Sequence, residues 1–306
     1  MAPRLLWIGL GNMGRGMVKN LVEKGNLDQP ILLFNRTKER AVDLSSSLAP
    51  GTTEAVDSIS EGVLKADVIF IILSQDDVVE AAVNEVLQND VAGKLIIECS
   101  TIHPDTTERL ARAVEAKGAE YLTAPVFGAP AAADAGQLVG VLAGPSSTVE
   151  RAKPFFAGVM SKRDIEMRDE PRRKALTLKL IGNTFILNMV EQLAEGHVFA
   201  EKSGLGNDYL HQWVETMFPG PYAAYSNRML SGDYYRREYP LFAVDLARKD
   251  ARHAMSLARE AGAPVPNVET ADAHLVKVKE HAGELGDFAG IYGVVRQEAG
   301  LKYENK

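Results

Sequence analysis

The chain has 306 residues, of which 46% are hydrophobic and 25% are charged, as is usual for a soluble globular protein. Its net charge of −7 argues against a general role in binding nucleic acid. We predict no membrane span, because no apolar run reaches the ~18 residues that a bilayer crossing needs. We predict no signal peptide, because Gly9 opens a turn too soon for an apolar h-region. The one cysteine, Cys99, rules out an internal disulfide. We therefore expect a cytoplasmic protein, with Cys99 as a small buried residue.

The first half of the chain alternates apolar strands with amphipathic helices. Helices are predicted over residues 13–24 and 106–116, among other segments. The predicted strands are residues 5–8, 31–34, 67–73, 95–98, 121–126, 138–143 and 163–169. Alternation of this kind predicts right-handed βαβ units and hence an α/β fold with a doubly wound parallel sheet of Rossmann type.

Beyond about residue 170 the strands stop and a helical pattern begins. Pro171 suits the first turn of a helix, and only two glycines interrupt the helical pattern up to Ser203. We predict one long interdomain helix there and an all-helical remainder. The expected domains are therefore a dinucleotide-binding Rossmann domain, residues 1–167, and a helical domain for substrate binding and oligomerisation, residues 168–306.

A glycine-rich turn follows the first predicted strand. Its first glycine permits a tight turn, its second leaves room for phosphates to reach the backbone, and its third allows close packing of the next helix. The N–H groups and dipole of that helix face the anion. These features predict a dinucleotide site made by Gly9, Leu10, Gly11, Asn12, Met13 and Gly14.

The residues after the second strand indicate which dinucleotide binds. Sites for NAD usually have a carboxylate at this position, which binds the ribose 2′-hydroxyl. Here Asn35 stands there, followed by Arg36 and Thr37. A carboxylate would repel a 2′-phosphate, whereas a guanidinium binds it bidentately and a hydroxyl donates to it. We predict NADP as the cofactor; the alternative is a solvated helix start with ordinary surface charge.

Lys179 and Asn183 lie four residues apart on the predicted long helix and so share one face. Their neighbours are largely apolar. Loss of hydration favours the neutral amine of a lysine, which suits proton transfer, and an amide one turn away can hold a hydroxyl or carbonyl in register. The alternative is a lysine at the boundary of an ordinary amphipathic helix. No histidine has metal-ligand spacing, so we predict no metal.

Several motifs together resemble the β-hydroxyacid dehydrogenases, over essentially the whole chain. They are the glycine turn, residues 98–102 (ECSTI), residues 124–128 (APVFG) with Gly136, Leu138 and Gly144, the pair Lys179 and Asn183, and Lys249 with Asp250. The resemblance implies an N-terminal cofactor domain, a helical domain that closes the substrate cleft, and a homodimer or homotetramer.

The resemblance also implies residue roles. Lys179 matches the family's catalytic lysine, the acid/base at the reacting oxygen, and Asn183 matches the residue that orients the substrate. Lys249 matches a lysine near both substrate and cofactor, with Asp250 as its structural neighbour. The remaining predicted contacts are Ser100 and Thr101 for substrate near the nicotinamide, and Leu73 and Ser74 for cofactor.

One substrate-binding loop departs from the family pattern. Phe127 stands where the family has a serine that grips a substrate carboxylate, although the backbone N–H groups of Gly128 and Ala129 remain available to an anion. The substitution favours a bulkier or less polar carbonyl compound. We predict an NADPH-dependent reductase of a small aldehyde or keto compound, reversible with a 3-hydroxy acid or alcohol. The alternatives are an imine reductase on the same scaffold and a non-catalytic NADPH-binding module.

Overall fold

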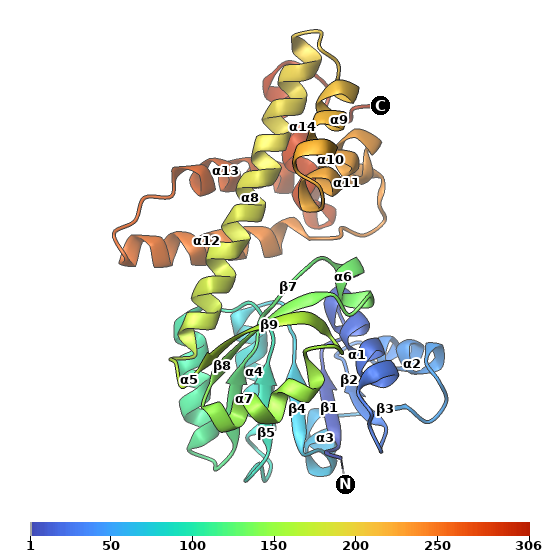
Figure 1. Ribbon diagram of the computed structural model, residues 1–306, viewed down its shortest axis with the longest axis vertical. Helices are drawn as coiled ribbons and strands as arrows, with labels where there is room; N and C mark the ends of the chain where they lie inside the picture. Colours follow the sequence, from blue (N-terminus) through green and yellow to red (C-terminus); the bar gives the residue numbers. More distant parts are fainter. Residues whose placement is uncertain (1) are drawn as a thin grey trace. The chain divides into compact units, whose positions relative to one another are not determined.

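The computed structural model describes residues 2–306 (Figure 1). The chain forms two compact units, Met1–Lys179 and Leu180–Lys306. The division falls inside the long helix α8 (Arg173–Lys202), whereas the predicted domain boundary lies between residues 167 and 168. Every described strand belongs to the first unit, and the second unit is helical.

The strands of the first unit form one nine-stranded sheet, with the order β3-β2-β1-β4-β5-β6-β8-β7 and with β9 paired to β8. Their bounds are β1 Leu5–Ile8, β2 Ile31–Phe34, β3 Thr53–Ala55, β4 Val68–Ile71, β5 Leu95–Glu98, β6 Glu120–Thr123, β7 Val126–Phe127, β8 Leu138–Gly144 and β9 Ser161–Arg168. The order reverses at β1, from which β2 leads outward one way and β4 the other. Ligands of doubly wound folds bind at this crossover, outside the carboxyl ends of the strands.

The sheet is parallel from β3 to β6 and mixed beyond β6. This confirms the doubly wound parallel sheet of Rossmann type and adds an antiparallel edge, since β6 and β7 both pair antiparallel with β8. The connection between β7 and β8 is residues 128–137, shorter than the dozen or more residues that a parallel crossover needs. The predicted strand 121–126 is also split at Ala124 and Pro125, because proline has no N–H to donate to the ladder.

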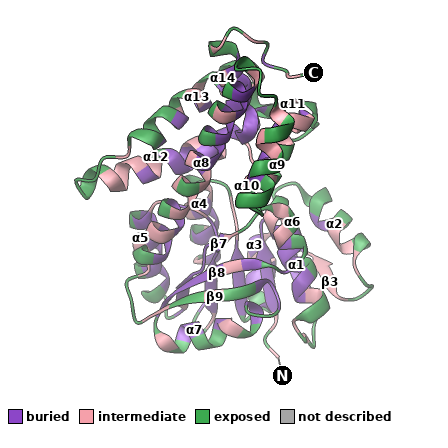
Figure 2. Cartoon of the chain, turned by 45° about the horizontal axis from the view of Figure 1, so that its top comes forward, coloured by how far each residue is buried: buried purple, intermediate pink, exposed green. Residues whose placement is uncertain are grey.

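Helices cover both faces of the sheet. Successive apolar side chains of β1 point to opposite faces, so both faces must be shielded from water. Leu5 and Trp7 join one core cluster, whereas Leu6 and Ile8 join another. One face packs against α1 (Asn12–Lys24), α2 (Lys38–Ser47) and α7 (Ser146–Ala152). The other face packs against α3 (Ile59–Lys65), α4 (Asp76–Val86) and α5 (Pro104–Glu115). Burial on both faces explains why these strands are nearly continuous apolar runs (Figure 2).

The second unit has one core cluster, to which α8 contributes Leu187, Val190 and Leu193. The helices that follow are α9 Asn207–Met217, α10 Pro221–Ser231, α11 Asp233–Arg236, α12 Val244–Glu260, α13 Pro266–Ala282 and α14 Ile291–Glu298. The all-helical prediction for this half is therefore confirmed. Of the helices within residues 2–306, none is both long and apolar enough to cross a membrane.

Candidate cofactor and substrate site

The three glycines of the turn after β1 have three different environments. Gly9 has φ +106°, and a Cβ there would lie 2.1 Å from the carbonyl oxygen of Ile72. A Cβ on Gly14 would lie 2.2 Å from the carbonyl oxygen of Gly9, so α1 can start this close only with glycine. Gly11, at the N-cap of α1, has no atom within 4 Å of a built Cβ. The turn therefore packs at its first and third glycines and is open at the second, as a pyrophosphate cradle requires.

Asn35, just beyond β2, joins the glycine turn to the loop that follows β2. Its Oδ1 accepts a hydrogen bond from the N–H of Leu10 at 3.0 Å, and its Nδ2 donates to the carbonyl oxygen of Thr37 at 2.9 Å. The amide side chain thus fixes the glycine turn and the loop after β2 relative to each other. Arg36 and Thr37 are exposed beside it, and within residues 2–306 no carboxylate forms an ion pair with Arg36.

The ends of β4 and β5 are tied together by Ser100. This residue is buried, and its Oγ accepts a hydrogen bond from the N–H of Leu73 at 2.8 Å. Its own N–H donates to Oε1 of the buried Glu98 at 2.5 Å. Ser100 is therefore held in the protein interior, whereas Ser74 is exposed and Thr101 is half-buried at the same edge of the sheet. The carboxyl ends of β1, β2, β4 and β5 bring these predicted cofactor contacts to one edge.

Cys99 is not exposed at the carboxyl ends of the strands. It is buried at the end of β5, and burial raises the pKa of its thiol well above the usual value. A thiol in that state is a poor nucleophile, and its role is packing. Among the described residues, 2–306, no three His, Cys, Asp or Glu side chains gather as metal ligands would.

Lys179, on α8, contacts the short strand β7. Its Nζ lies 4.5 Å from the centroid of the Phe127 ring, over the face of the ring. Lys179 is 9% exposed, and Phe127 is half-buried. The ring packs against a small apolar cluster that includes Val141 and Leu178. The amine that the sequence singled out is thus largely removed from water and faces an aromatic ring, an arrangement that holds an ammonium group in place.

The second unit holds a polar group of three residues. Nδ2 of Asn183 donates to Oδ2 of Asp250 at 2.7 Å, and Nζ of Lys249 lies 3.2 Å from Oδ1 of Asp250. Asp250 is 6% exposed and Lys249 is 9% exposed. The Asp250 carboxylate accepts one N–H of the Asn183 amide. The carbonyl oxygen of that amide can still accept a hydrogen bond from a hydroxyl group. Among the site residues predicted from sequence, Lys179 contacts Phe127 in the first unit, while Asn183 and Lys249 meet at Asp250 in the second.

Two residues have structural roles that the sequence pattern does not predict. Asp250 joins its neighbour Lys249 to Asn183, which lies 67 residues earlier. The side chain of Asn35, at the position that suggests ribose binding, supports the glycine turn. A signal for Asp250 was its place beside a lysine on one helix; for Asn35 no local signal reveals a bond to Leu10.

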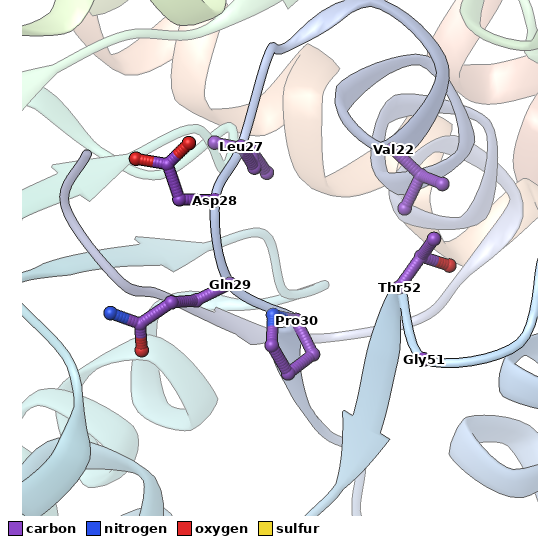
Figure 3. Close-up of a pocket in the computed structure, with 7 residues that line it drawn as sticks. All are labelled: Val22, Leu27, Asp28, Gln29, Pro30, Gly51 and Thr52. Atoms are coloured by element: carbon purple, nitrogen blue, oxygen red, sulfur yellow. The ribbon is translucent and has the colours of Figure 1, made fainter. Parts of the chain in front are cut away.

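A cavity of about 110 Å³ lies elsewhere in the first unit (Figure 3). Its lining residues are Val22, Leu27, Asp28, Gln29, Pro30, Gly51 and Thr52. Pro30 directly precedes β2 and Thr52 directly precedes β3, so the cavity is at the amino ends of these parallel strands. The glycine turn is at the carboxyl end of β1, on the opposite edge of the sheet. The cavity is therefore separate from the candidate site.

The comparisons with known proteins cover both units. Residues 4–166 match the model described as the NAD binding domain of 6-phosphogluconate dehydrogenase. Residues 174–295 match the model described as NAD-binding of NADP-dependent 3-hydroxyisobutyrate dehydrogenase. The fold and the glycine turn define an NAD(P)-dependent oxidoreductase of the Rossmann class.

Individual relatives narrow the class. The chain is 35% identical to the NADH-dependent oxidoreductase ucdB of Aspergillus ustus, over 95% of this chain and 98% of that protein. It is 28% identical to glyoxylate/succinic semialdehyde reductase 1 of Arabidopsis thaliana, over 95% and 97% of the two chains. A structure of Mycobacterium tuberculosis 3-hydroxyisobutyrate dehydrogenase with L-serine is 25% identical, with a TM-score of 0.80, over 97% and 100%. The chain belongs to the β-hydroxyacid dehydrogenase family.

Proposed function

We propose that this protein is an NADPH-dependent reductase of a small aldehyde or keto compound, acting reversibly with the corresponding 3-hydroxy acid or alcohol. The observation that carries the proposal is the buried amine of Lys179, fixed over the Phe127 ring on the helix face that also bears Asn183. A positive charge removed from water is effective at stabilising an oxygen on which negative charge develops.

The residues of the glycine turn fit a dinucleotide. The open space over Gly11 and the N–H groups at the start of α1 would receive the pyrophosphate, with Leu10, Asn12 and Met13 beside it. Leu73 and Ser74, at the end of β4, would line the same cofactor. When bound, the nicotinamide supplies a hydride to a carbonyl carbon or accepts one from an alcohol.

The preference for NADP rests on Arg36 and Thr37. Both are exposed beside Asn35, and an arginine without a carboxylate partner within residues 2–306 is suited to a 2′-phosphate. The relative ucdB is described as NADH-dependent. The basic residue nevertheless favours NADPH here, because a 2′-phosphate gains a charge-assisted hydrogen bond that a 2′-hydroxyl lacks.

The chain's own residues have distinct tasks in the proposed reaction. Lys179 donates its proton to the carbonyl oxygen as negative charge develops there, and takes it back in the reverse direction. Asn183, with one N–H held by Asp250, orients the substrate oxygen through its remaining polar groups. Lys249 adds positive charge near substrate and cofactor. Thr101 contributes a hydroxyl near the substrate, and Ser100 holds the loop that carries it.

The test is consumption of NADPH with a panel of aldehydes, keto acids and cyclic imines, followed by absorbance of the reduced nicotinamide. We expect turnover with carbonyl compounds. Turnover confined to imines would instead support the imine reductase alternative. Tight NADPH binding without turnover of either class would support a non-catalytic binding module.

We also propose that the protein is a homodimer or homotetramer assembled through the second unit. α9 is largely exposed (Figure 2). It exposes three large apolar side chains at a spacing of four residues, Tyr209, Trp213 and Met217, and only Val214 of this helix is buried. Phe199, on α8, is 74% exposed. Large apolar side chains that are exposed in this number on one unit favour association with a second copy of the chain. Light scattering after size exclusion should give a multiple of 33.3 kDa, and Trp213→Lys should lower it.

A further inference from the structure

The segment that contacts Lys179, residues 124–136, is apolar except at one position. From Ala124 to Gly136 the chain has no lysine, arginine or histidine, and its one charged residue is Asp134. Phe127 is the large side chain of this segment, and it is half-buried. This segment itself therefore supplies no cation to pair with an acidic substituent. The ammonium of Lys179 is already assigned to the reacting oxygen.

The Phe127 ring is held in one position. Phe127 pairs with Val139 across the antiparallel ladder of β7 and β8. Gly128, directly after it, has φ +141°, and a Cβ there would lie 2.6 Å from a methyl carbon of Leu138. The backbone is therefore fixed on both sides of Phe127. The ring packs against the cluster containing Val141, and the ammonium of Lys179 lies over its face.

A fixed aromatic face beside the proton donor discriminates between substrates. A carboxylate placed against the ring loses water and finds no hydrogen-bond donor on the ring, while the ammonium of Lys179 beside it is engaged by the reacting oxygen. An alkyl or aryl group placed against the ring gains free energy, because its apolar surface is removed from water. The backbone N–H groups of Gly128 and Ala129 remain available to an anion, but both residues are exposed to competing water.

We propose that Phe127 is a specificity-determining residue, and that it selects carbonyl compounds with an apolar alkyl or aryl substituent over those with a carboxylate. The proposal rests on the proposed reductase function and names its substrate class. It makes the Phe127 ring both a wall of the substrate site and a support for Lys179.

The experiment compares two aldehydes that differ in the terminal group, 3-phenylpropanal and 4-oxobutanoate, with NADPH. For the unmodified protein we expect kcat/KM to be higher for 3-phenylpropanal by about tenfold or more. Phe127→Ser should reduce or reverse this ratio, mainly through a higher KM for the phenyl compound. Phe127→Leu, which keeps an apolar side chain without a ring, should retain the preference for the apolar aldehyde and lose kcat with both, because Lys179 loses its support.

The possible failures are distinct. A preference of the unmodified protein for 4-oxobutanoate, or a ratio unchanged in Phe127→Ser, would overturn the role of Phe127 and leave the reductase function intact. Should neither aldehyde nor any other carbonyl compound be reduced, the proposed function itself would fail. If Phe127→Ser does not fold, the ratio of the unmodified protein still tests the apolar preference, and an unchanged kcat of Phe127→Leu with both aldehydes would overturn the support of Lys179 by the ring.

Discussion

The Nζ atom of Lys179 lies 4.5 Å from the centroid of the Phe127 ring, and these residues are 52 positions apart in the sequence. One comes from the long helix α8 and the other from the short strand β7. The pairing matters because it restricts where the amine can point. A lysine side chain has four rotatable bonds, and an aromatic face reduces the positions that its ammonium visits.

Replacing Lys179 with alanine tests the acid/base assignment. We expect kcat to fall by a factor on the order of 10² to 10⁴, as is typical when a general acid is lost. NADPH affinity should change little. Lys174→Ala is the control, because Lys174 is an exposed lysine of the same helix whose partner is Glu170. Nearly full activity of Lys179→Ala would rule the assignment out.

Arg36 is expected to distinguish the two dinucleotides. Arg36→Ala should raise the Kd of NADPH by about 10- to 100-fold through loss of a charge-assisted hydrogen bond. The Kd of NADH, which has no 2′-phosphate, should stay within about threefold of its original value. Fluorescence titration of both cofactors measures these values. Arg112→Ala, on the exposed side of α5, serves as the control, and equal losses for NADPH and NADH would refute the 2′-phosphate pocket.

The first two glycines of the turn should respond differently to alanine. Gly9→Ala puts a Cβ 2.1 Å from the Ile72 carbonyl oxygen at φ +106°, so the backbone must move and unfolding by denaturant should occur at a much lower concentration. Gly11→Ala meets no atom within 4 Å. It should keep the free energy of unfolding within about 1 kcal/mol, while its methyl group weakens NADPH binding. Equal stability losses in the two variants would contradict this account.

Asp250 is expected to act by positioning Asn183 and Lys249. Asp250→Ala removes a hydrogen bond of 2.7 Å and an ion pair of 3.2 Å, and leaves the charge of Lys249 largely buried and without this partner. We expect the free energy of unfolding to fall by about 3 kcal/mol and kcat/KM to fall by about tenfold or more. Asp245→Ala is the matched control, because Asp245 is a more exposed residue of α12 paired to Lys279. An Asp250→Ala protein with unchanged kcat/KM would limit Asp250 to a structural role.

Two histidines of the second unit should contribute to the free energy of unfolding with opposite pH dependences. A hydrogen bond from His274 to Glu191 raises the pKa of His274, whereas burial lowers the pKa of His197. The contribution of His274 is fully present below its unfolded pKa near 6.5 and is lost as the pH rises through the folded value. The contribution of His197 is present above pH 6.5 and is lost as the pH falls.

Denaturant unfolding at several pH values measures this difference. The stability gap between the unmodified protein and His274→Gln should narrow from pH 6 to pH 8, and the gap for His197→Gln should narrow as the pH is lowered. Parallel pH dependences in the two variants would contradict the assigned causes.

The sequence predicted the parts of the fold that depend on local pattern. Continuous apolar runs identified β1, β2, β4 and β5, and the position of Pro171 indicated the start of α8. The antiparallel edge escaped prediction because strand direction depends on how the chain returns, and the apolar run of β8 looks the same in either direction. The split of residues 121–126 was foreseeable from Pro125, which cannot donate to a ladder.

In the candidate site, too, the sequence predicts the relations between neighbouring residues and the tertiary structure decides the distant ones. Lys179 and Asn183 share a helix, so their common face follows from a spacing of four residues. The link from Asn183 to Asp250 spans 67 residues and arises only when α8 and α12 pack in one unit.

From its sequence alone this chain had a glycine turn in a strand–turn–helix context, basic residues after the second strand, and a lysine one helical turn before an asparagine. Those are short-range relations, which helix and strand periodicity convert directly into geometry. The tertiary structure alone decided that an aromatic ring faces Lys179, that Asp250 joins Asn183 to Lys249, and that Asn35 supports the glycine turn. Such contacts depend on how separate elements pack, and side-chain packing is determined by the whole core rather than by neighbouring residues in the chain.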